Sequence, residues 1–237
     1  WEGAAAAHLT TDSTGSTTNT TYAAANAGDP SSANVVFSAG NDATSTNVTV
    51  VGAVAAHSIT VEELLNISAS TTPSLTLGAG GVTINSTALG TTTWASSLPT
   101  ILAASQSWTN NNDNLFTVSG TITGSAASGT QTLTIAGTGA GGTLLAGVIS
   151  DGGNGGTVAV NVNTAAGVTT LFKGANTFTG GLVLTQGILK TGQNSSTSLA
   201  LGSGTLTLAG GELQLFRPSS TGSNFGRNTT VIGNTQI

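Results

Sequence analysis

Two stretches decide the fold: residues 174–192, GANTFTGGLVLTQGILKTG, and residues 202–216, GSGTLTLAGGELQLF. Short runs in which apolar and small polar residues alternate are separated by glycine pairs, and hardly any charge is present. Alternation with a period of two predicts β-strands that bury one face. Each run is too short to bury a face alone. We therefore expect many short strands to pack around a common core.

The same pattern recurs along the chain. Residues 74–85 (SLTLGAGGVTIN) and 204–215 (GTLTLAGGELQL) are near copies, each with two strand-like runs joined by glycine, and residues 131–147 are a looser copy. Alternation is equally clear at Val82 and Ile84 and at Val158, Val160 and Val162. Imperfect internal repetition indicates a repeat architecture. A hairpin sandwich fits short strands too, but it favours two-residue Asn-Gly or Asp-Gly turns, and the chain has a single Asp-Gly pair. The repeats favour a parallel β-solenoid.

Composition supports an ordered, repetitive β protein. The chain has 44 threonines, 26 serines and 34 glycines, a net charge of −5, and only 5% charged residues. Threonine favours strands because its branched Cβ suits a pleated surface. No run of about 20 apolar residues is present, so we expect no membrane-spanning segment in this chain. An acidic chain with four cations would repel phosphates, so we expect no nucleic-acid partner.

The chain contains no cysteine, so neither disulfides nor thiolate metal sites hold the fold. It begins at Trp1 and contains no methionine, so we expect a processed or partial chain. Helix signals are nearly absent. Residues 61–65 (VEELL) are the best candidate but too short, and we expect Glu62 and Glu63 to mark a corner between strands.

Residues 174–215 resemble the autotransporter-associated β-strand repeat, also called the passenger-associated transport repeat. The resemblance rests on G-A-N-T-F-T-G-G, an apolar strand, a G-x-L strand, A-L-G-x-G and a T-L-x-x-G-G-x-L pair. Phe178 stands where tyrosine is more usual. The resemblance implies a right-handed parallel β-helix that is exported to the cell surface or beyond, with no catalytic residues to transfer.

We therefore predict an all-β, right-handed, single-stranded parallel β-helix over residues 34–237, preceded by a cap or irregular arm at 1–33. Coils of about 20 to 25 residues predict nine or ten turns through residues 34–232. The leucines expected to point inward are Leu182, Leu184, Leu206, Leu208, Leu213 and Leu215.

The sequence carries no recognisable catalytic constellation. Its nine carboxylates are widely spaced: Glu2, Asp12, Asp29, Asp42, Glu62, Glu63, Asp113, Asp151 and Glu212. A polysaccharide-cleaving site needs clustered carboxylates. We predict no enzyme activity, no catalytic residues and no cofactor. If the chain were such an enzyme, Glu62, Glu63 and Asp151 would be the first residues to replace.

Binding sites are equally sparse. His8 and His57 are the only imidazoles, and without cysteine or a nearby acid pattern we predict no zinc site. Asp151 opens the sequence DGGNGG, which we interpret as a tight turn because a calcium-binding nonapeptide repeat needs tandem copies in another order. Threonine pairs could form an ice-binding face only if they were in register on successive coils, and their spacing is unequal.

Three tryptophans are the remaining candidates for a ligand site. Trp1, Trp94 and Trp108 could stack on sugars, or they could cap or line the core. We expect a non-catalytic, extracellular structural solenoid: a cell-surface stalk or adhesin, or the repeating subunit of a fibre. Its partners would be further copies of itself, through ends or sides, and possible surface glycans. The alternative is a β-helix that binds or degrades carbohydrate.

Overall fold

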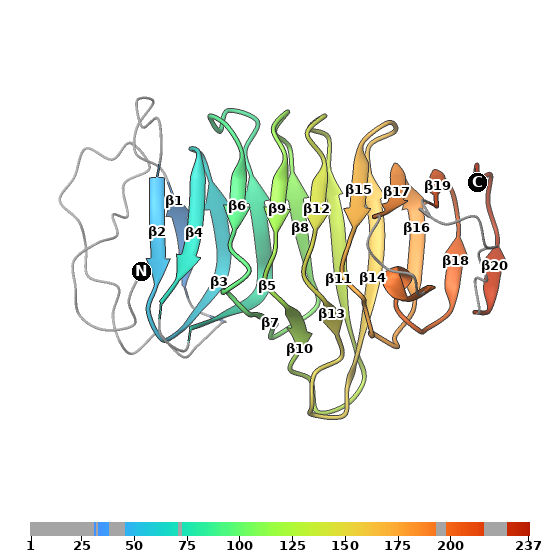
Figure 1. The fold of residues 1–237 in the computed structure, drawn as a ribbon, viewed down its shortest axis with the longest axis horizontal. Coiled ribbons are helices and arrows are strands. Elements are labelled where there is room, and N and C mark those ends of the chain that lie inside the picture. Colours follow the sequence, from blue (N-terminus) through green and yellow to red (C-terminus); the bar gives the residue numbers. More distant parts are fainter. Residues whose placement is uncertain (1–30, 32, 38–45, 71–72, 193–197, 216–226) are drawn as a thin grey trace.

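The structure is a computed structural model that describes residues 31, 33–37, 46–70, 73–192, 198–215 and 227–237. In these residues the chain winds into a parallel β-solenoid of about seven turns with almost no helix (Figure 1). The all-β solenoid predicted from the sequence is confirmed. The expected nine or ten turns were too many, because several coils are longer than predicted. Thr143, for example, pairs with Thr170, a spacing of 27 residues.

All strand pairs in the described residues are parallel, and they form two sheets. The twelve-stranded sheet contains β1 (Asn34–Phe37), β3 (Ala53–Val61), β5 (Ser74–Ile84), β7 (Thr100–Leu102), β8 (Gln106–Asn110), β10 (Ile122–Gly124), β11 (Thr130–Gly137), β13 (Ile149–Ser150), β14 (Thr157–Thr164), β16 (Leu182–Gln186), β18 (Leu206–Leu208) and β20 (Thr229–Val231). The eight-stranded sheet contains β2 (Thr46–Val50), β4 (Leu65–Ala69), β6 (Thr92–Trp94), β9 (Phe116–Val118), β12 (Thr143–Leu145), β15 (Thr169–Phe172), β17 (Ile188–Thr191) and β19 (Glu212–Gln214). A short 3-10 helix, η2 (Ser198–Leu201), precedes β18.

The twelve-stranded sheet forks at β5. Residues Leu75–Leu77 pair with β7, whereas Val82–Ile84 pair with β8. Strands β7, β10 and β13 continue from the first half as a separate row, which we call the branch; it lies below the body of the solenoid in Figure 1. Three coils in the middle of the solenoid therefore carry three strands each. The coils that follow have one strand in each sheet.

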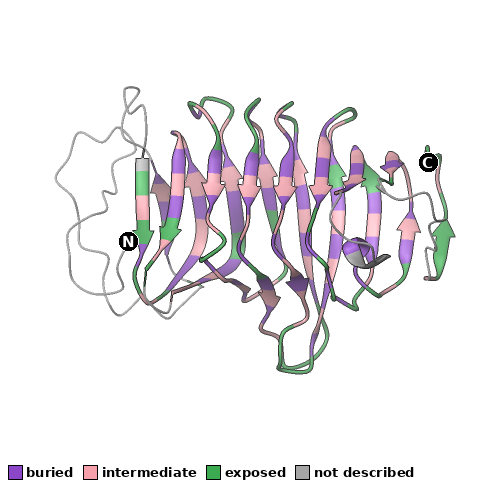
Figure 2. Ribbon diagram, in the orientation of Figure 1, coloured by how far each residue is buried: buried purple, intermediate pink, exposed green. Residues whose placement is uncertain are grey.

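The core lies between the sheets and is built by the predicted alternation. Buried and partly exposed residues alternate along the strands in Figure 2, and Val158, Val160 and Val162 are fully buried. Of the leucines predicted to point inward, five are buried: Leu182, Leu184, Leu206, Leu208 and Leu213. The prediction for Leu215 was wrong. It is 39% exposed, because β19 ends at Gln214 and Leu215 lies beyond the ladder.

Corners between strands follow the chain's glycines and small polar residues. The prediction that Glu62 and Glu63 mark a corner is confirmed, because β3 ends at Val61 and β4 begins at Leu65. The predicted cap at 1–33 lies almost entirely outside the described residues. Within the described part of the chain, no helix is both long and apolar enough to cross a membrane.

Candidate functional site

The carboxylates singled out in the sequence lie in different parts of the solenoid. Glu62 and Glu63 differ in their surroundings at this corner: Glu63 is buried, whereas Glu62 Oε1 accepts a hydrogen bond from Asn85 Nδ2 at 3.2 Å. Asp151 lies several coils away, at the corner between β13 and β14. The structure therefore does not bring these three carboxylates together.

Asp151 closes its corner with three accepted hydrogen bonds. Its Oδ1 accepts from the backbone N–H groups of Val158 (2.7 Å) and Thr179 (3.0 Å), and its Oδ2 accepts from Thr179 Oγ1 (2.8 Å). Gly152 and Gly155, which follow it, have positive φ values of 84° and 99°. Only glycine adopts this backbone region without strain. The interpretation of DGGNGG as a tight turn therefore agrees with the geometry.

The described residues contain no group of three or more His, Cys, Asp or Glu side chains that could hold a metal ion. His57 lies in β3, next to the bulge at which β3 and β5 change register. His8 and Trp1 lie outside the described residues.

Trp94 and Trp108 are fully buried in the core. Trp94 contacts both Trp108 and Phe116 edge to face, with ring centroids 5.5 Å apart in each pair. The Trp108 indole N–H donates to Gln106 Oε1 at 2.9 Å. These rings line the core, so neither presents a face on which a sugar could stack. Of the two interpretations of Trp94 and Trp108, the core is correct.

The threonine pair at 132 and 134 does not continue onto the next coil. Thr132 and Thr134 in β11 lie beside Ala159 and Asn161 in β14. The register that an ice-binding face would need is therefore broken at this step.

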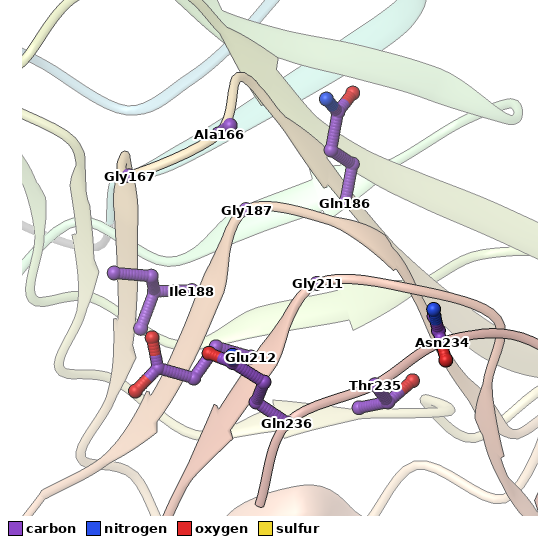
Figure 3. A pocket seen from close by; sticks show the side chains of 10 residues that line it. All are labelled: Ala166, Gly167, Gln186, Gly187, Ile188, Gly211, Glu212, Asn234, Thr235 and Gln236. Carbon is purple, nitrogen blue, oxygen red and sulfur yellow. The ribbon is translucent and has the colours of Figure 1, made fainter.

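A groove opens where β14, β16, β18 and β20 turn toward the eight-stranded sheet. It encloses about 580 Å³ and is open to solvent. Its lining is contributed by four consecutive coils: Ala166, Gly167, Gln186, Gly187, Ile188, Gly211, Glu212, Asn234, Thr235 and Gln236 (Figure 3). We call this feature the corner groove.

Unequal corner lengths account for the groove. Residues 165–168 join β14 to β15, whereas Gly187 alone joins β16 to β17. A register shift between Val162 and Asn163 accompanies this shortening, so that Asn163 lies beside Gln186. The corner consequently recedes at Gly187, and the longer turns of the coils on either side form the walls.

The corner groove is polar and contains one ionisable group. Glu212 accepts a hydrogen bond from Gln214 Nε2 at 2.7 Å, and it lies between Ile188 and Gln236 in the ladder. Side-chain amides come from Gln186, Asn234 and Gln236. A lining with one carboxylate and three amides is suited to hydrogen bonding with a ligand, whereas acid–base cleavage needs a second tuned group.

Arg227 lies near the same end of the solenoid but is used for packing. Its Nη1 donates to the carbonyl oxygen of Leu201 at 2.8 Å. Partial burial lowers the pKa of its guanidinium through desolvation. This cation therefore ties the last coil to η2.

Sequence reasoning missed the corner groove because no single segment encodes it. Gln186 precedes Asn234 and Gln236 by two coils, and stacking brings these amides into one lining. The partial signal was Gly187, a single residue between two predicted strands.

No family model matches the chain, and neither the curated proteins nor the solved structures include a match. The resemblance of residues 174–215 to the autotransporter-associated repeat stays a prediction.

Proposed function

We propose that this chain is a non-catalytic extracellular scaffold, either a cell-surface stalk or adhesin or the repeating subunit of a fibre. The observation that carries the proposal is a continuous parallel ladder whose last strand in the described residues, β20, presents an exposed edge. The resemblance of residues 174–215 to a repeat of exported proteins supports the extracellular location.

A ladder of this kind suits a stalk or fibre. Hydrogen bonds between coils run along the solenoid axis, and each coil contacts only its neighbours. Examples at the C-terminal end are Leu206 N–H to Asn228 O (3.0 Å) and Ile232 N–H to Leu208 O (2.9 Å). Because several such bonds join each pair of neighbouring coils, the bonds of one interface share a force along the axis. Such a rod can also grow by adding further coils.

The exposed end has the properties of a docking edge. All three residues of β20 are exposed, and β20 pairs only with β18 in the described residues (Figure 2). Val231, Ile232 and Ile237 are 59%, 70% and 79% exposed. An unprotected edge strand offers N–H and C=O groups to a further strand. Sparse charge adds little repulsion between copies. A further coil, from a longer chain or from a second copy, would cover these side chains.

Two measurements test the proposal. Electron microscopy of the native material, combined with cell fractionation, should find the protein outside the cell, as fibres or as rods attached to the surface. Fibres whose axial repeat is near one chain length would support the fibre form. A protein found only inside the cell would contradict the extracellular role.

Assembly through β20 can be tested on the purified chain. Replacing Val231 and Ile232 together with lysine should abolish association in sedimentation velocity at high concentration, because charged edges resist strand pairing. Thr207→Lys, on the outer face of β18, is the matched control and should associate like wild type. A wild-type chain that stays monomeric at high concentration would favour the stalk over the fibre.

A further inference from the structure

We infer that the corner groove binds a neutral, hydroxyl-rich oligosaccharide. The inference rests on the shape of the groove and on the chemistry of its lining. It does not require a second copy of the chain, because all ten lining residues come from one chain.

The shape admits a chain-like ligand. A volume of about 580 Å³ lies within the range of roughly 300–1,000 Å³ that is usual for small-molecule sites. The groove crosses four coils, so its long direction follows the solenoid axis. Gly167, Gly187 and Gly211 contribute no side chains, so backbone surface forms part of the lining. The C–H face of a sugar ring can approach such a surface closely.

The hydrogen-bonding groups match hydroxyls. The amides of Gln186, Asn234 and Gln236 are exposed, and each both donates and accepts hydrogen bonds. A sugar hydroxyl also does both. The Glu212 carboxylate accepts only, and charge-assisted hydrogen bonds to hydroxyls are stronger than neutral ones.

The polar side chains of the lining lie on two sides of the groove. Figure 3 shows the Glu212 side chain close to Ile188, Gln186 on the corner at Gly187, and Asn234 and Thr235 on the far side of Gly211 from Ile188. Ile188 adds an apolar surface next to the carboxylate, in register with Glu212. Sugars present both C–H faces and hydroxyl edges, and this lining offers a partner for each.

Charge selects against acidic ligands. Glu212 is the one ionisable residue in the lining, and no cation lies among the lining residues. A uronic acid or a phosphate would therefore meet repulsion without a compensating charge. The expected ligand is an uncharged glycan.

The test uses the full wild-type chain at a concentration at which sedimentation velocity shows only monomer, so that assembly does not interfere. Calorimetric titration with neutral hexasaccharides of the cellulose, starch and chitin series should show binding to at least one of them. Polygalacturonate and calcium chloride are the anionic and cationic probes, and both should give no signal.

The variants assign the binding to the groove. Asn234→Ala with Gln236→Ala, and separately Glu212→Gln, should each raise Kd by about tenfold, which corresponds to losing one or two hydrogen bonds. Asn47→Ala removes an exposed amide in β2, at the other end of the solenoid, and should leave Kd unchanged.

Three results would overturn the inference. They are no binding of any neutral hexasaccharide up to about 10 mM, equal affinity in the groove variants and wild type, or binding of calcium alone. Failure of assembly with retained sugar binding would count against the fibre and leave the groove inference intact.

Discussion

Residues 74–85 and 204–215 have nearly the same sequence pattern but occupy different corners of the solenoid. In the first, both runs belong to β5, whose halves pair with the branch and with the main row of the twelve-stranded sheet. In the second, the runs form β18 and β19, which belong to different sheets. The two copies are therefore not equivalent positions of a repeat.

The strand register shows how far the two copies are displaced from equivalent positions. Following the register back from Leu206 leads through Leu182, Val160 and Leu133 to Gln106 in β8. Gln106 lies two residues before Trp108, which pairs with Val82. The position corresponding to Leu206 is therefore close to Gly80, in the bend of β5, and not at Leu75.

Buried polar side chains explain why the middle of the molecule has an additional corner. Gln106 Nε2 donates to Leu77 O at 3.0 Å, and Gln131 Nε2 donates to Leu102 O at 2.9 Å. Leu77 and Leu102 are partners in the β5–β7 ladder, so the two glutamines make the same contact one coil apart. Asp151 closes the corresponding corner of the next coil. These groups satisfy backbone atoms that a sharp bend would leave without partners.

The C-terminal coils solve the same problem differently. Asn176 is fully buried; its Oδ1 accepts from Ile149 N–H at 2.8 Å and its Nδ2 donates to Ala200 O at 2.5 Å. It connects the end of the branch to η2, where no further branch strand forms. One internal amide thus bridges the last strand of the branch and η2. The comparison indicates that the polar side chains buried in the core determine how many corners each coil has.

The largest expected effect lies in the core beside β5. Trp108→Ala should destabilise the protein by about 4 kcal/mol, because it leaves a cavity against Trp94 and Phe116. Leu206→Ala, in the C-terminal copy, should cost less, about 3 kcal/mol. Urea unfolding with hydrogen exchange on each region measures both. A larger loss of stability for Leu206→Ala than for Trp108→Ala would show that the cluster of Trp94, Trp108 and Phe116 is not the more stable part of the core.

The second prediction concerns the glycine at the bend of β5. Gly81 has φ of +64°, and a Cβ there would overlap the backbone carbonyl oxygen of Ser107. Gly81→Ala should therefore destabilise by about 3 kcal/mol, combining backbone strain with overpacking. Gly129→Ala is the control: φ is +74° but no atom lies within 4 Å of the new Cβ, so only about 1 kcal/mol is expected. Equal costs would mean that backbone strain alone matters.

The third prediction concerns a substitution that should disrupt the additional corner in the branch. Gln131→Leu removes the acceptor for Ser125 and Ala126 N–H and the donor to Leu102 O, and should cost about 2 kcal/mol. Hydrogen exchange should accelerate in the branch before the rest of the solenoid. Gln186→Leu, at an exposed position, should change stability by less than about 0.5 kcal/mol. Unchanged protection of the branch would contradict a closing role for Gln131.

The smallest expected effect has the opposite sign. Thr143 is buried and its hydroxyl has no hydrogen-bond partner, whereas Thr164 Oγ1 donates to Val168 O at 3.1 Å at a corner. Thr143→Val should stabilise by about 1 kcal/mol, and Thr164→Val should destabilise by about as much. Thermal unfolding of the two variants measures this. If the two substitutions changed the melting temperature in the same direction, a buried threonine hydroxyl would not stabilise the fold only where it has a hydrogen-bond partner at a corner.

The sequence by itself determined the strands and their inward faces. Alternation at positions such as Val158, Val160 and Val162 is a local property, since successive side chains of any strand point to opposite faces. The scarcity of helix in the described residues and the corner at Glu62 and Glu63 were predictable for the same reason. Leu215 escaped prediction because alternation does not say where pairing stops.

Three features could be read only from the tertiary structure: the corner at which each glycine lies, the number of turns of the solenoid, and the position of the corner groove. Those features depend on the register between coils, which is set by side chains about one coil apart. Near copies such as 74–85 and 204–215 look equivalent in sequence, but their neighbours differ: Gln106 donates to Leu77 in the first, and Gly187 lies beside Gly211 in the second. Stacking converts these distant residues into neighbours, and no local pattern records that proximity.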